Sequence, residues 1–182
     1  MAATGGLEML KRTLLVVAIL LSCVGCDQAT KFAAKTSLSE VQAVTYLGGT
    51  LRLQVANNYG AFLGLGTSLP QRQRTALLSF GVAVALLAML VYCLASSSSN
   101  PVTVPALALV IGGGTSNLID RLYYGGYVVD FLNVGIGSVR TGIFNFADVF
   151  IMIGVLLLIF RDQISSRLLA KRAPREDVRT GT

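Results

Sequence analysis

The sequence TALLSFGVAVALLAMLVYCLA, residues 75–95, is largely apolar and contains no charged side chain. About 20 helical residues cross the hydrocarbon core of a lipid bilayer, so this run predicts a membrane span. It is followed by the polar turn SSSSNP, residues 96–101. One apolar run before it, residues 13–26, and two after it, residues 102–119 and 143–160, predict three further spans.

The composition of the chain agrees with a membrane protein. Of its 182 residues, 53% are hydrophobic and 13% are charged, and the mean hydropathy is +0.67. Soluble domains average about 45–50% apolar and about 25% charged residues. We therefore expect one all-α membrane domain over residues 1–182, with four transmembrane helices. Only residues 41–65, with β-branched and alternating residues around Gly48-Gly49, predict a small β-hairpin.

The basic residues indicate how the spans are oriented. More than half of the 15 Lys and Arg residues lie before the first span or in the tail, residues 161–182. The positive-inside rule then predicts that both termini are cytoplasmic and that residues 41–65 are extracytoplasmic, although Arg72 and Arg74 oppose it. The net charge of the chain is +6, six of the 15 Lys and Arg residues lie in the tail, and no basic, aromatic-interleaved face is visible. This distribution indicates a position beside anionic lipid head groups rather than binding to nucleic acid.

The absence of histidine from the chain excludes several kinds of site. Nucleophilic systems of the Ser-His and Cys-His type and all His-ligated metal sites require it. Cys23 and Cys26 form a CxxC without a second pair, so these residues and Cys93 are expected to be packing residues, with a Cys23–Cys26 disulfide left open. An alternative is that the start of the chain is a lipoprotein signal peptide and that the mature part begins at Cys23, but three further spans follow it. No metal or cofactor is expected.

Acidic residues are rare between residues 28 and 160 and therefore informative. There are four, and each is expensive at membrane depth: Glu40, Asp120, Asp130 and Asp148. Asn145 and Asp148 are spaced i, i+3 and share a helix face, which also fits a simple helix cap. The same spacing relates Asn117 to Asp120. For Asp120 we favour an ion pair with Arg121 or Arg140.

Asp130 lies between apolar neighbours in GYVVDFL, residues 126–132, so it is not a solvated loop charge. A Gly-rich segment separates it from Asp148 and could fold the two together. Two adjacent carboxylates cannot both ionise easily, so one keeps a proton while the other activates a water. An ion-coupled transporter would also carry intramembrane acids, but no inverted repeat is visible. A purely structural membrane protein does not explain both Asn–Asp pairs together with Asp130.

Five sequence blocks, in order over residues 10–162, resemble the lipoprotein signal peptidase family, also called signal peptidase II. They are DQATK (27–31), NYGAF (58–62), GGTSNLIDR (113–121), VVDF (128–131) and FNFAD (144–148). The second block departs from the family pattern because Phe62 follows Ala61 directly. Residues 1–10 and the tail after Arg167 match nothing in the family and are expected to be disordered or cytoplasmic extensions.

The resemblance implies a monomeric aspartic endopeptidase of the bacterial cytoplasmic (inner) membrane that needs no cofactor. Its substrates would be diacylglyceryl-modified prolipoproteins, cut just before the lipidated cysteine near the extracytoplasmic surface. Residues 41–65 would form a β-cradle and a short periplasmic lid beside the membrane lipids. The catalytic pair would be Asp130 and Asp148. Substrate would be bound by Asn58, Gly60, Asn117, Arg121 and Asn145, within groove walls formed by Val128, Val129 and Phe131. Supporting roles would fall to Asp27, Lys31, Asp120 and Ala147.

Overall fold

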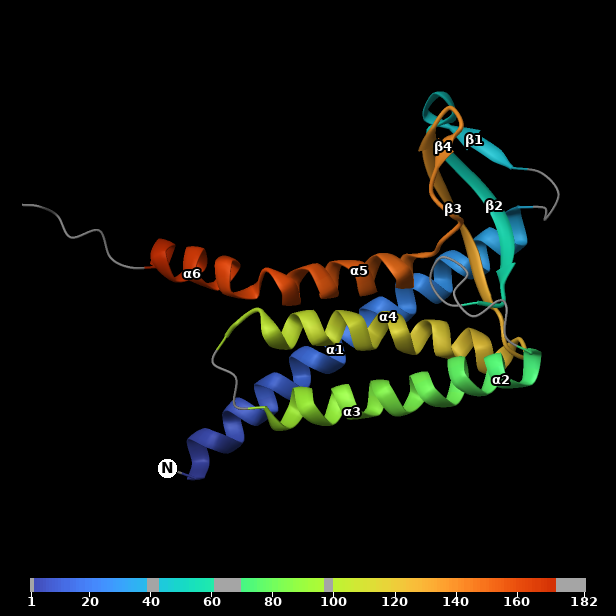
Figure 1. The fold of residues 1–182 in the computed structure, drawn as a ribbon. Coiled ribbons are helices and arrows are strands. Elements are labelled where there is room, and N and C mark those ends of the chain that lie inside the picture. Colours follow the sequence, from blue (N-terminus) through green and yellow to red (C-terminus); the bar gives the residue numbers. More distant parts are fainter. Residues whose placement is uncertain (1, 39–42, 61–69, 97–99, 173–182) are drawn as a thin grey trace, which may run out of the picture.

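The structure is a computed structural model that describes residues 2–38, 43–60, 70–96 and 100–172 (Figure 1). Helices make up most of it. The first, α1, covers Ala2–Ser37, and α4 covers Thr103–Tyr123. Between them, the short α2 (Gln71–Thr75) continues through the π-helical turn η3 (Ala76–Gly81) into α3 (Val82–Ala95). The last two are α5 (Phe146–Ile159) and α6 (Arg161–Arg172).

Helix α4 lies at the centre and packs against α1, α3 and α5 (Figure 1). A run of three glycines, residues 112–114, allows these close contacts. Gly112 faces the side chain of Cys23 on α1, Gly113 faces the backbone of Ala147 on α5, and Gly114 faces Leu86 on α3. Toward the start of α4 from this run, an apolar core is formed by Val16, Cys93, Val104, Leu107, Ala108 and Ile111.

The helices differ in their suitability for crossing a membrane. By length and composition, two described helices qualify, Gly5–Ser37 and Arg72–Ala95. A third span results if α5 and α6, which are bent by 70° relative to each other, are taken together. Helix α4 carries buried polar side chains, among them Asn117 and Asp120, which lower its hydropathy. The predicted number of four spans therefore stays a prediction.

Two boundaries differ from the sequence-based expectation. Helix α1 extends well beyond the predicted span 13–26 in both directions, so Asp27 and Lys31 lie inside a helix. Of the two extensions expected to be disordered or cytoplasmic, residues 2–10 and 168–172 are helical, so the alternative of disorder is wrong for them. Residues 173–182 lie outside the described part of the chain.

A four-stranded antiparallel sheet with the order β1-β2-β3-β4 lies at one end of the helices (Figure 1). The predicted hairpin is confirmed as β1 (Val44–Tyr46) and β2 (Leu51–Asn58). The other half, β3 (Val128–Ile136) and β4 (Val139–Arg140), was missed, so an all-α fold with one hairpin was an incomplete prediction. The predicted lid falls partly on residues 61–65, outside the described residues.

The pairing of β2 with β3 determines which side chains face the helices. A bulge interrupts the register between Leu53 and Ala56, and beyond it Ala56 stands opposite Asp130. Val55 turns to the other face, where it packs with Val129 and Phe131 against the end of α1. Asp130 is thus on the face of the sheet that looks toward α5.

Candidate active site

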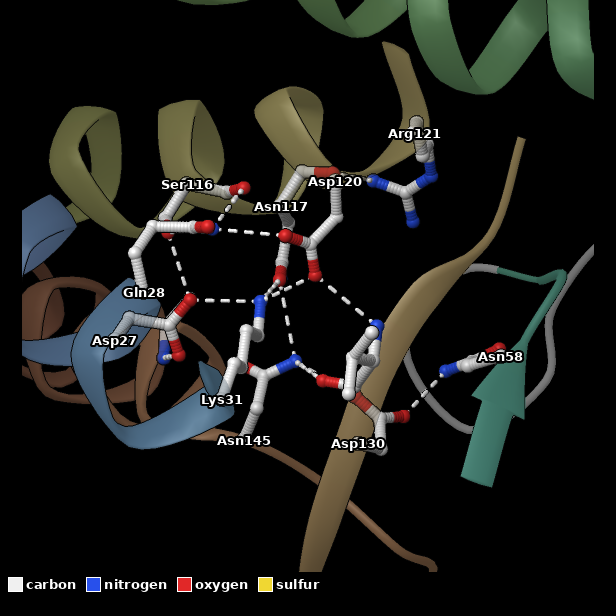
Figure 2. A network of polar contacts seen from close by, with 12 residues as sticks. Asp27, Gln28, Lys31, Asn58, Ser116, Asn117, Asp120, Arg121, Asp130 and Asn145 are labelled. Carbon is white, nitrogen blue, oxygen red and sulfur yellow. Dashed lines mark hydrogen bonds and ion pairs between the residues drawn. The ribbon is translucent and has the colours of Figure 1, made fainter. Parts of the chain in front are cut away.

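Asp130 lies on β3 and is 2% exposed. Its carboxylate accepts two hydrogen bonds from asparagine side chains (Figure 2). Asn58 Nδ2, at the end of β2, lies 2.9 Å from Oδ2, and Asn145 Nδ2 lies 2.6 Å from Oδ1. The aspartate that the sequence singled out is therefore buried and held by donors from two different segments.

Asp148 occupies the first turn of α5 and forms a capping box with Asn145. The side-chain oxygen of Asn145 accepts from the Asp148 N–H at 3.0 Å, and Asp148 Oδ2 accepts from the Asn145 N–H at 3.2 Å. Asn117 Nδ2 donates to Asp148 Oδ1 at 2.9 Å. Helix capping and a place in the site were considered as alternatives for this pair, and the structure combines them.

The two carboxylates line the same cavities. A cleft of about 550 Å³ opens between β2, the segment 141–144 and α5, and both Asp130 and Asp148 line it together with Asn58 and Met152. A second cavity of about 140 Å³, toward α3 and α4, is also lined by both aspartates. Asp130 and Asp148 therefore share both cavities, and their pairing as catalytic groups stays a prediction.

The environment of Asp130 favours its protonated form. Burial, followed by the negative charge of Asp148, raises the pKa of Asp130 to about 7 from its ordinary value of 3.8. The hydrogen bonds from Asn58 and Asn145 and the charge of Lys31 act in the opposite direction without cancelling this rise. Near neutral pH, Asp130 can thus carry the single proton that two neighbouring carboxylates share.

Arg121 and Gly60 also meet at the site. Arg121 Nη2 donates to the Gly60 carbonyl at 3.1 Å, and the Gly60 N–H donates to Asn58 Oδ1 at 2.9 Å. Arg121 thereby holds the chain that leads out of β2 beside Asp130. Val128 lines the smaller cavity, as expected for a wall residue. Val129 and Phe131 do not, because strand alternation turns both into the core on the opposite face, which corrects that expectation.

Behind the site lies a buried ionic cluster (Figure 2). Lys31 Nζ lies 2.7 Å from Asp27 Oδ2 and 2.8 Å from Asp120 Oδ2. The partner of Asp120 is therefore Lys31, and the expected pairing with Arg121 or Arg140 is wrong. Neighbouring residues of a helix point about 100° apart, so Asp120 and Arg121 face different surroundings.

The ionic cluster is tied to the backbone on both sides. Asp27 Oδ1 accepts from the N–H of Ala147, in the first turn of α5, at 2.8 Å, and Asp120 Oδ2 accepts from the N–H of Val129 at 3.0 Å. Sequence reasoning missed Gln28 and Ser116, which donate to Asp120 and Asp27. Both lie inside the recognised blocks, but neutral polar residues gave no signal of their own.

The remaining sequence candidates do not form a site. All three cysteines are free; Cys23 and Cys93 are buried, whereas Cys26 is exposed. Within the described part of the chain, no group of His, Cys, Asp and Glu side chains is arranged to hold a metal ion.

Comparison with known proteins identifies the relationship of this chain. Residues 19–163 match the family described as signal peptidase (SPase) II. The chain belongs to the signal peptidase II family. Similar members are the lipoprotein signal peptidases of Sphingopyxis alaskensis, 35% identical over 156 residues (84% of this chain, 85% of that one), and of Moorella thermoacetica, 33% identical over 144 residues (79% and 88%).

The fold of this signal peptidase II family member also resembles a solved structure. A bacterial membrane enzyme determined by the in meso method at 2.3 Å matches with a TM-score of 0.70 at 25% sequence identity. The match covers 89% of this chain and 92% of that one. Helices with a small antiparallel sheet at one end are therefore an arrangement already seen in a membrane enzyme.

Proposed function

We propose that this protein is an aspartic endopeptidase that removes signal peptides from diacylglyceryl-modified prolipoproteins, cutting just before the lipidated cysteine. Asp130 and Asp148 are the catalytic pair. The observation that carries this proposal is that both carboxylates line one cleft and accept hydrogen bonds from the same residue, Asn145, whose Nδ2 donates to Asp130 and whose backbone N–H donates to Asp148. The family membership supplies the substrate class.

The pair acts with one shared proton. Asp148 takes a proton from a water molecule as its oxygen attacks the scissile carbonyl carbon, while protonated Asp130 donates to the carbonyl oxygen. The tetrahedral adduct then collapses: the C–N bond breaks, the proton on Asp148 moves to the leaving nitrogen, and Asp130 regains its own. The raised pKa of Asp130 supports its assignment as the proton donor.

Asparagines and Arg121 complete the machinery around the pair. Asn58, Asn117 and Asn145 fix the carboxylates by donating to them. Arg121 and Gly60 lie at the edge of the pair, where an extended substrate backbone would meet polar partners. The apolar cleft beside Asp148, which includes Val149 and Met152, suits the residues next to a lipidated cysteine.

Four helical segments cross the bacterial cytoplasmic membrane in this proposal: α1, α2–α3, α4 and α5. Helix α4 is the least apolar, but its Asn117, Asp120 and Arg121 are buried among its neighbours rather than exposed to lipid. The catalytic pair and the sheet lie at one end of the bundle, and the start of α1 and α6 lie at the other (Figure 1). The basic tail then faces the cytoplasm and the pair faces outward, where lipid-anchored substrates arrive. The enzyme acts as a monomer.

Single substitutions of the pair test this function. Asp130→Asn and Asp148→Asn keep the side-chain size and should each abolish cleavage of a diacylglyceryl prolipoprotein by the purified, reconstituted enzyme. Asp162→Asn is the matched control, because this aspartate is 79% exposed on α6. It should cleave at the normal rate. Normal turnover by either dyad variant, in protein that inserts and purifies like the wild type, would overturn the assignment.

A further inference from the structure

Within the described residues, Lys31 is the only charged side chain that donates to the side-chain oxygen of Asn117, the residue whose amide NH2 group donates to Asp148. The Lys31 side chain is 3% exposed. Three acceptors surround Nζ: Asp27 Oδ2 at 2.7 Å, Asp120 Oδ2 at 2.8 Å and Asn117 Oδ1 at 3.0 Å. An ammonium has three N–H donors and no acceptor, so this tripod uses all of them.

Two legs of the tripod are fixed independently of Lys31. Asp27 is held by Ser116 Oγ at 2.7 Å and by the Ala147 N–H at 2.8 Å. Asp120 is held by Gln28 Nε2 at 2.8 Å and by the Val129 N–H at 3.0 Å. The position of the ammonium is thereby set by α1, α4, β3 and the start of α5. Its third N–H can only point at Asn117.

We propose that Lys31 is a positioning residue that locks the side-chain amide of Asn117 with its NH2 group toward Asp148. If the amide were rotated by 180°, its NH2 group would meet the Lys31 ammonium, and donor would face donor. The amide of Asn145, whose Nδ2 lies 3.1 Å from Asn117 Oδ1, disfavours the rotated form for the same reason. Rotation would also turn the Asn117 oxygen toward the carboxylate of Asp148.

The lock has a consequence for the shared proton, and this step rests on the proposed function. With its NH2 group toward Asp148, Asn117 stabilises a negative charge there, so the proton stays on Asp130. The other charged groups near the pair are Asp27 from α1 and Arg121 from α4, with Asp120 beside Arg121, while β2 contributes the neutral Asn58. Arg121 Nη1 donates to the backbone carbonyl of Asn117 at 3.4 Å, whereas Lys31 is the charged group that donates to its side-chain oxygen.

The experiment compares turnover per folded enzyme across a set of variants. Lys31→Met leaves two buried carboxylates with one counter-charge fewer, so the charge-balanced Asp27→Asn/Lys31→Met variant is made beside it. Lys31→Gln keeps a neutral donor. Lys35→Met is the matched control: it removes an exposed lysine one turn further along α1 that stacks on the ring of Tyr124. All are assayed for kcat, KM and the pH profile of kcat on a diacylglyceryl prolipoprotein.

We expect the Lys31→Met variants to lose about 10- to 100-fold in kcat, the effect of one charge-assisted hydrogen bond, with KM little changed. The pH at which kcat falls should also move. Lys31→Gln should recover part of the loss, and Lys35→Met should behave as the wild type. The Lys31→Met change is also made in Asn117→Ala enzyme. Because Lys31 acts through Asn117, this double variant should have nearly the same kcat as Asn117→Ala alone.

Two results would overturn the lock. One is an unchanged kcat and pH profile in folded Lys31→Gln or charge-balanced enzyme. The other is a double variant in which the loss of kcat from Lys31→Met multiplies in full with the loss of kcat from Asn117→Ala. That result is expected for a residue that only stabilises the fold. If no Lys31 variant folds, Asn117→Asp decides: it keeps the acceptor for Lys31 and loses the donor to Asp148, so an unchanged pH profile refutes the proposal. Normal turnover by Asp130→Asn or Asp148→Asn would instead overturn the proposed function.

Discussion

Gly113 is the position where the smallest addition should disturb the catalytic pair. A Cβ atom placed on this residue of α4 would lie 2.4 Å from the carbonyl oxygen of Ala147 and 2.9 Å from Cγ1 of Ile151, both on α5. An ordinary contact begins near 3.4 Å, so Gly113→Ala requires the helices to separate by about 1 Å. The oxygen belongs to the backbone and cannot rotate away.

The separation acts directly on Asp148. Ala147 precedes it in the chain, and Asn117, which lies one turn after Gly113 on α4, donates to it at 2.9 Å. Moving α5 by about 1 Å would stretch this hydrogen bond beyond its normal range. Overpacking of this kind costs about 1–3 kcal/mol in stability, and a 1 Å misplacement of catalytic groups costs about 10²-fold in rate.

Denaturant unfolding in detergent and the rate of prolipoprotein cleavage measure the two effects. Gly114→Ala is the matched control next in sequence, because its Cβ would meet only the flexible end of the Leu86 side chain. Gly25→Ala is a second control, since nothing lies within 4 Å of its Cβ. If Gly113→Ala unfolded and cleaved like Gly25→Ala, the close approach of α4 and α5 would not be what holds the pair in place.

Further outcomes are expected for the pH dependence, for the buried and exposed ion pairs and for the cysteines. The rate of cleavage should fall as pH rises through about 7, because Asp130 then loses its proton, and a rate that stays level to pH 9 would contradict this. The same raised pKa makes the folded protein lose stability as pH rises from 3.8 to about 7, so Asp130→Asn should raise the unfolding temperature at pH 8 by more than at pH 4. Asp27→Ala should destabilise the protein by about 3–5 kcal/mol, because it leaves Lys31 without one of its buried partners. Glu8→Ala, at an exposed pair with Lys11, should cost less than about 1 kcal/mol in the same unfolding assay. In folded protein, a maleimide should label Cys26 and leave the buried Cys23 unmodified, as read by mass spectrometry.

The parts of the fold that depend on local sequence were predictable. Residues 75–95 form one uncharged run, and the structure has a helix there from Gln71 to Ala95 with a π-helical turn. The hairpin around Gly48-Gly49 was also visible, since turn glycines separate two β-branched segments. Both features need only neighbours within a few residues of one another.

The parts that depend on distant neighbours were not predictable in the same way. No local pattern predicts that Asp130 pairs with Ala56, because the two strand partners are 74 positions apart in the chain. The first span was predicted to end at residue 26, too early, because Asp27 and Lys31 resemble the polar flank of a span. Their burial becomes clear only once Asp120 and Ser116 are placed beside them. The prediction that Asp130 and Asp148 are the catalytic pair came from the resemblance more than from spacing.

The bulge in β2 decides which side chain lies beside Asp130, because it shifts the alternation of side chains along the strand by one residue. If the pairing continued in register from Leu53 with no bulge, Val55 would stand opposite Asp130 in place of Ala56. Its branched side chain would crowd the carboxylate, while the smaller alanine would leave a void beside Val129 in the core. A one-residue slip of the pairing would thus produce both defects at once. In relatives whose β2 has the same length but no bulge, the order of the small and the branched residue should therefore be reversed.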